Sequence, residues 1–96
     1  MTVEIPLADV RRACELLIAH VERHGGSVTV EHDYFWSVPL ESAYDVDAEP
    51  ADLTIGQVTE SWEHVRTMLD DESRTVGYGL VWLADVLRAV GHGTTG

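Results

Sequence analysis

The chain has 96 residues, of which 45% are hydrophobic, and a formal net charge of −11 at pH 7. This length and composition fit one folded domain and argue against wholesale disorder. Such a negative charge repels phosphate backbones and anionic membrane surfaces. The six basic residues are all arginines and form no basic stripe, so direct binding to nucleic acid or to a membrane is disfavoured.

The only cysteine, Cys14, cannot form an internal disulfide, which suits a reducing compartment. No apolar run approaches the roughly 20 residues of a membrane span. The N-terminus lacks the basic and apolar blocks of a secretory signal. We therefore expect a cytoplasmic protein.

Residues 6–24 predict an amphipathic helix. Pro6 suits a first helical turn, where its missing N–H is not needed. An apolar stripe follows at spacings of three and four residues, formed by Leu7, Val10, Cys14, Leu17 and Val21. Gly25 and Gly26 end the helix.

Two strands are predicted on either side of an acidic loop at residues 40–52. The first strand spans residues 27–37, because Val28 and Val30 alternate with polar residues. This alternation places Tyr34 and Trp36 on the core side and leaves Phe35 exposed. Residues 53–58 predict a second strand that pairs with residues 28–33, since a lone strand needs a partner. A helix beginning at Thr54 with a capping box is the alternative.

The C-terminal part predicts two helices, at residues 59–70 and 73–90, followed by a flexible tail at residues 91–96. The apolar sides of these helices consist of Trp62, Val65 and Leu69 in the first, and of Val76, Leu80, Leu83, Leu87 and Val90 in the second. The fold class is therefore α+β, with a two-stranded antiparallel hairpin packed against three helices in the order α-β-β-α-α.

The middle of the chain combines acidic and aromatic residues. From His24 to Val65 there is no lysine or arginine but there are nine carboxylates. Acidic surfaces with aromatic anchors bind basic protein partners. The predicted partner-binding residues are Asp33, Phe35, Tyr44, Asp45, Asp47 and Glu49, together with Tyr78 and Trp82 of the last helix. The leading hypothesis is a non-enzymatic protein-interaction domain, such as an adaptor, an accessory subunit or an inhibitor of the antitoxin or immunity kind.

Two other hypotheses remain open. A small metal-dependent or acid/base enzyme would use Asp33, Asp45 and a histidine such as His20 or His32. His20 and His24 lie four residues apart and could face one metal, but two ligands do not make a site, so no metal, cofactor or catalytic residue is assigned. A homo-oligomeric module, such as a homodimer, would instead pair through the last helix at Tyr78, Val81 and Trp82.

The residues from Asp33 to Trp62 also form a recognisable pattern. It consists of Asp33-Tyr34-Phe35-Trp36-Ser37-Val38-Pro39, Tyr44-Asp45, Glu49-Pro50, Leu53-Thr54-Ile55-Gly56-Gln57 and Ser61-Trp62. This pattern resembles a family of small uncharacterised bacterial proteins, a domain of unknown function, and covers roughly a third of the chain. The resemblance implies that the acidic loop and its flanks form a defined unit, and it implies no activity, cofactor or ligand.

Overall fold

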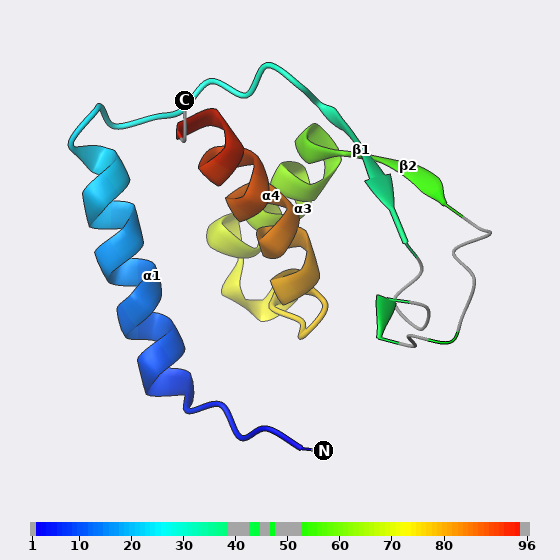
Figure 1. The fold of residues 1–96 in the computed structure, drawn as a ribbon, viewed down its shortest axis with the longest axis horizontal. Helices are drawn as coiled ribbons and strands as arrows, with labels where there is room; N and C mark the ends of the chain where they lie inside the picture. Colours follow the sequence, from blue (N-terminus) through cyan, green and yellow to red (C-terminus); the bar gives the residue numbers. More distant parts are fainter. Residues whose placement is uncertain (1, 39–42, 45–46, 48–52, 95–96) are drawn as a thin grey trace.

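The computed structural model of the chain describes residues 2–38, 43–44, 47 and 53–94. Its elements are α1 (Leu7–Glu22), β1 (Tyr34–Ser37), β2 (Thr54–Gln57), α3 (Val58–Asp70), the 3-10 turn η1 (Glu72–Arg74) and α4 (Gly79–Thr94) (Figure 1). The predicted α+β class and the order α-β-β-α-α are confirmed. The predicted acidic loop falls mostly outside the described residues.

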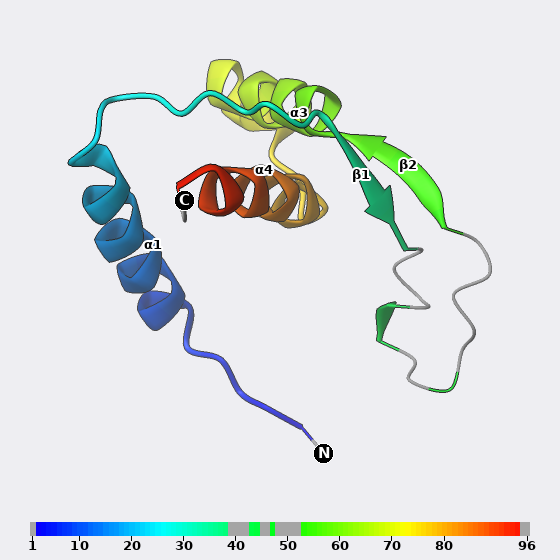
Figure 2. The same ribbon diagram turned by 45° about the horizontal axis from the view of Figure 1, so that its top comes forward.

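The centre of the molecule is the packing of α3 against α4, which lie side by side in both views (Figures 1 and 2). Val58, Ser61 and Val65 follow one another at spacings of three and four, so they share one face of α3, and all three are buried. Ser61 Oγ donates a hydrogen bond of 3.0 Å to Asp85 Oδ2 of α4. A partly buried polar contact therefore joins the two helices, and its Ser61 lies between two buried valines of α3.

The two strands form an antiparallel pair, which confirms a strand rather than a helix start at residues 54–57. Tyr34 lies opposite Gln57, so the predicted pairing of the second strand with residues 28–33 is wrong. The ladder stops there because the chain turns into α3 at Val58, whose N–H donates to the Asp33 carbonyl at 2.8 Å. Residues 27–33 consequently have no strand partner and form an extended connection from α1.

The predicted orientation of β1 is also wrong. Phe35 is half-buried, whereas Tyr34 and Trp36 are 67% and 68% exposed. Gly56 lies directly opposite Phe35 in the ladder, and a Cβ atom on Gly56 would come within 2.5 Å of Phe35 Cζ. The missing side chain of Gly56 gives the Phe35 ring its place on the sheet. The alternation at Val28 and Val30 could not set this orientation, because these residues are not in the strand.

The last helix begins later and ends later than predicted. Asp71 accepts hydrogen bonds from the N–H and the hydroxyl of Ser73, at 3.1 Å and 2.6 Å, and this contact stabilises η1 in place of a first α-helical turn. At the other end the helix continues through Gly91 to Thr94, whose Oγ1 donates to the Val90 carbonyl at 3.0 Å. The predicted tail is therefore helical as far as Thr94.

The apolar sides predicted for α3 and α4 are only partly those that pack: Val65 is buried, and Leu83 and Val90 are half-buried. Trp62, Leu69 and Leu80 are exposed. The buried side of α3 instead contains Ser61, and α4 presents buried Gly79 near Met68. Close contact between the helices uses small and polar residues, which a hydrophobic pattern does not reveal.

Helix α1 stands apart from the other elements (Figures 1 and 2). None of its residues is buried, and Leu17 in the predicted apolar stripe is 65% exposed. The chain exposes 8313 Å² and has a radius of gyration of 15.1 Å. A compact monomer of this mass would expose about 5,500 Å² and have a radius of about 12.5 Å. Among the described residues, no helix is long and apolar enough to cross a membrane.

Replacing Gly56 with alanine should destabilise the protein. The new methyl group would displace the Phe35 ring from the hairpin, at a cost of about 1–3 kcal/mol in the free energy of unfolding. Urea denaturation followed by circular dichroism measures the change. Gly77→Ala is the matched control, because nothing lies within 4 Å of a Cβ at that position. Equal stability of the two variants would contradict the proposed role of Gly56.

Candidate functional site

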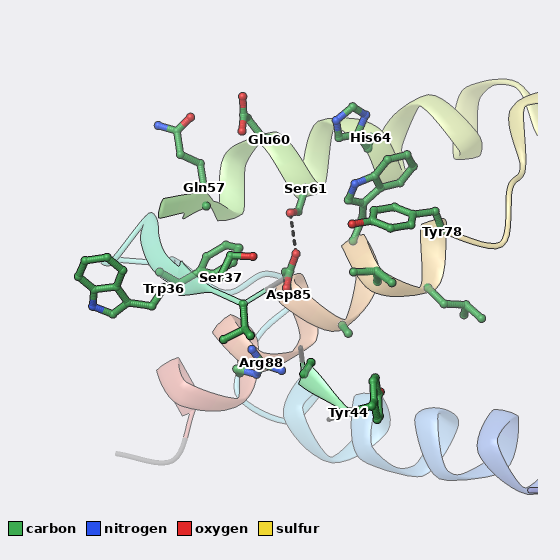
Figure 3. Close-up of a pocket in the computed structure, with 18 residues that line it drawn as sticks. Trp36, Ser37, Tyr44, Gln57, Glu60, Ser61, His64, Tyr78, Asp85 and Arg88 are labelled. Carbon is green, nitrogen blue, oxygen red and sulfur yellow. Dashed lines mark hydrogen bonds between the residues drawn. The ribbon is translucent and has the colours of Figure 1, made fainter. Parts of the chain in front are cut away.

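An open cleft of about 600 Å³ lies between the hairpin and the α3–α4 pair (Figure 3). Its walls come from β1, β2, α3, α4 and residues 43–44. The lining residues are Phe35, Trp36, Ser37, Val38, Ala43, Tyr44, Gly56, Gln57, Glu60, Ser61, His64, Tyr78, Leu80, Val81, Trp82, Ala84, Asp85 and Arg88.

One wall of the cleft is a cluster of three rings. His64 of α3 stacks on Trp82 of α4, with ring centroids 4.1 Å apart and planes inclined by 14°. Tyr78, in the turn before α4, meets Trp82 edge to face at 5.3 Å. Mutual packing restrains the orientation of these rings, so this wall is an ordered aromatic surface.

Two further aromatic side chains of the cleft, Trp36 and Tyr44, are exposed to water. Trp36 projects from β1 at the rim of the cleft, and Tyr44, at the opposite side of the opening, is 86% exposed (Figure 3). Exposed apolar area is unfavourable by roughly 25 cal/mol per Å², so covering these rings releases free energy. Trp and Tyr also lose little side-chain entropy on binding, which makes them effective anchors.

Three charged side chains also line the cleft. Glu60 projects from the first turn of α3, and Asp85 lies deeper, where it accepts the hydrogen bond from Ser61 (Figure 3). Arg88 extends from α4, one turn beyond Asp85. The lining thus offers two carboxylates and one guanidinium to a ligand, in a chain whose net charge is −11.

The structure brings half of the predicted partner-binding residues to this cleft. Phe35, Tyr44, Tyr78 and Trp82 all line it, although they come from three separate parts of the chain. Asp47 is exposed and is not part of the lining. Asp45 and Glu49 lie outside the described residues.

Asp33 has a structural contact instead. The N–H and the hydroxyl of Thr59 both donate to Asp33 Oδ1, each at 2.7 Å. Gln57, which precedes α3, makes no side-chain cap, so the carboxylate of Asp33 caps this helix from another element. This arrangement joins the hairpin to α3, while a role of Asp33 in partner binding stays a prediction.

Several cleft residues were not predicted from the sequence. Trp36 was assigned to the core, and Glu60, His64, Asp85 and Arg88 were not singled out. The stacking of His64 on Trp82 depends on how α3 and α4 are aligned, which no local pattern records. Phe35 lies opposite Gly56 in the facing strand, so Phe35 packs on the sheet and Trp36 points to the other face. Gly56 was the one residue in the sequence that could have indicated this orientation.

The histidines do not support a metal centre. His20 and His24 are exposed at the end of α1. The ring centroids of His32 and of His92 in α4 are 6.4 Å apart. In the described ranges, no group of three or more histidine, cysteine, aspartate or glutamate side chains is placed to hold a metal ion. Of the candidate set for an acid/base enzyme, Asp33 caps α3, and Asp45 lies outside the described residues.

No protein-family model matches the chain, and no curated protein or solved structure is significantly similar to it. The resemblance noted in the sequence therefore stays a prediction.

Removing the Asp33 carboxylate should weaken α3. Asp33→Ala leaves the Thr59 N–H without its acceptor, and we expect a loss of about 1–2 kcal/mol in the free energy of unfolding. Asp33→Asn keeps an acceptor oxygen and should lose about half as much. Glu31→Ala, at an exposed position in the same connection, is the control. Chemical denaturation measures all three, and an unchanged Asp33→Ala midpoint would refute the cap.

Proposed function

We propose that this protein is a non-enzymatic interaction domain that binds a basic segment of a partner protein in the cleft between the hairpin and the α3–α4 pair. The observation that carries the proposal is that two exposed aromatic rings, Trp36 and Tyr44, line the same cleft as the carboxylates of Glu60 and Asp85. An adaptor, an accessory subunit or an inhibitor of the antitoxin or immunity kind would act in this way. A cytoplasmic location belongs to the same proposal.

The shape and lining of the cleft suit a polypeptide segment. It is open to solvent and its lining mixes apolar and polar side chains, as the surfaces of protein–protein contacts do. Trp and Tyr are over-represented among the residues that dominate binding energy at such contacts. A segment laid across the opening could contact Trp36, Tyr44 and the Tyr78–Trp82 cluster together.

The charge of the chain selects the kind of segment. A net charge of −11 attracts basic partners over distances of about 10 Å at moderate salt and repels acidic ones. Within the cleft, an arginine or lysine of the partner can stack on Trp36 or Tyr44 and pair with Glu60. Contact with the aromatic rings would raise the affinity, whereas the carboxylates would raise the association rate and favour basic partners over acidic ones.

The test is an affinity pull-down from the lysate of the source organism at low and at high salt, with identification of the bound proteins. We expect a basic partner that is retained at low salt and lost at high salt. Trp36→Ala should weaken its binding about 30-fold or more, as loss of an aromatic anchor at a protein–protein contact does. Glu60→Gln should slow association mainly at low salt.

Two matched controls separate the cleft from general surface effects. Tyr34→Ala removes a ring that is as exposed as Trp36 on the same strand but does not line the cleft. Glu72→Gln removes one exposed carboxylate outside the cleft. Both controls should bind as the wild type does. The absence of a salt-sensitive partner, or equal binding by Trp36→Ala and Tyr34→Ala, would overturn the proposal.

A further inference from the structure

A second groove lies on the other side of α4. It has a volume of about 680 Å³ and opens between the end of α1, the connection at residues 25–33 and the α3–α4 pair. Its lining is mainly apolar and includes Ile18, Val58, Trp62, Leu83, Leu87 and Val90. Trp62 and Leu87 are partly exposed there, so the groove presents apolar side chains to water.

The apolar side of α1 is largely uncovered in the single chain. Leu7, Val10, Leu17 and Ile18 on one side of α1 are all exposed, and only Val21, next to the groove, is half-buried. This is the stripe that the helical spacing assigns to a core. The chain thus exposes both an apolar helix face and an apolar groove.

We propose that α1 of a second copy of this chain occupies the groove, and that the protein is a homodimer in which the two copies exchange this helix. Each copy offers one helix and one groove, so a two-fold arrangement fills both and closes the assembly. The residues of this proposal lie outside the cleft that Trp36 and Trp82 line. The proposal therefore does not depend on the function proposed for that cleft.

The area that the single chain exposes is large enough to form the interface of such a dimer. The chain exposes 8313 Å², which exceeds the value for a compact monomer by about 2,800 Å². A specific interface buries about 800 Å² on each partner, well within this excess. The 16 residues of α1 span about 24 Å, long enough to follow the groove along the α3–α4 pair.

The distribution of charge favours α1 as the occupant. Residues 7–24 contain three arginines and three carboxylates, whereas residues 25–96 contain three arginines and thirteen carboxylates. Two acidic bodies would repel each other if they met directly. A helix with no net charge placed between them avoids this repulsion.

The connection between α1 and the hairpin keeps the helix away from its own body. Gly25 has a φ of +139°, a conformation that residues with a Cβ rarely adopt, and residues 26–33 run extended from there to β1. Closure of α1 onto its own groove would require a rearrangement of this connection. Exchange between copies fills the groove with the connection as it stands.

Light scattering coupled to size-exclusion chromatography tests the dimer on the full chain over a range of concentrations. We expect a mass twice the 10.6 kDa of one chain. Leu17→Asp on the helix stripe and Leu87→Asp in the groove should each raise the dissociation constant at least about 100-fold. Leu16→Asp, on the opposite side of α1, and Leu69→Asp, exposed on α3 outside the groove, should remain dimeric.

Cys14 supplies a second measurement. Its thiol is exposed in the single chain and lies on the same stripe as Leu17, so dimerisation should cover it. Its reaction with a thiol reagent should slow with increasing protein concentration in the wild type but not in Leu17→Asp. Circular dichroism checks folding, and Leu17→Ala, which favours helix, should weaken the dimer in the same direction if the aspartate variant unfolds.

Each contrary result overturns the proposal. A wild-type mass of one chain at the highest soluble concentration would mean that α1 closes on its own groove or that another protein fills it. A dimer insensitive to Leu17→Asp and Leu17→Ala would exclude the helix stripe. A dimer insensitive to Leu87→Asp would exclude the groove.

Discussion

The packing of α3 against α4 is the contact on which the remaining structure depends. Val58 and Val65 are the buried apolar side chains among the described residues, and the Ser61–Asp85 hydrogen bond crosses the interface between them. So small a core leaves little free energy to hold other elements in place. The hairpin is attached to this pair through Asp33, whose carboxylate and carbonyl accept hydrogen bonds from the first residues of α3.

The aromatic cleft and the apolar groove share α4 as a common wall. At 100° per residue, Val81, Asp85 and Arg88 face the aromatic cleft, whereas Leu83, Leu87 and Val90 face the apolar groove on the opposite side. A helix that is apolar on one side and mixed on the other can serve two different contacts. Self-association through the groove would therefore leave the cleft open for a partner, and each copy of a dimer would present one.

The existence of the two strands could be predicted from the sequence, but their register could not. Alternating apolar residues and the need of a lone strand for a partner favoured two antiparallel strands, with a helix start at Thr54 as the alternative. Their register was not predictable, because it depends on where α3 begins and on the opening beneath Phe35 left by Gly56. A shift in the paired residues reverses the two faces of a strand, so Trp36 moved from the predicted core to the rim of the cleft.

The sequence by itself determined the α+β class, the order of the elements, the acidic charge and the stripe along α1, because these follow from composition and local periodicity. It also predicted Phe35, Tyr44, Tyr78 and Trp82 as partner-binding residues; all four line one cleft, and their role in binding stays a prediction. Only the tertiary structure decided which faces of the helices meet. Helix contacts made through Ser61, Asp85 and small residues leave no hydrophobic period, and an apolar stripe cannot specify whether its partner lies in the same chain or in another.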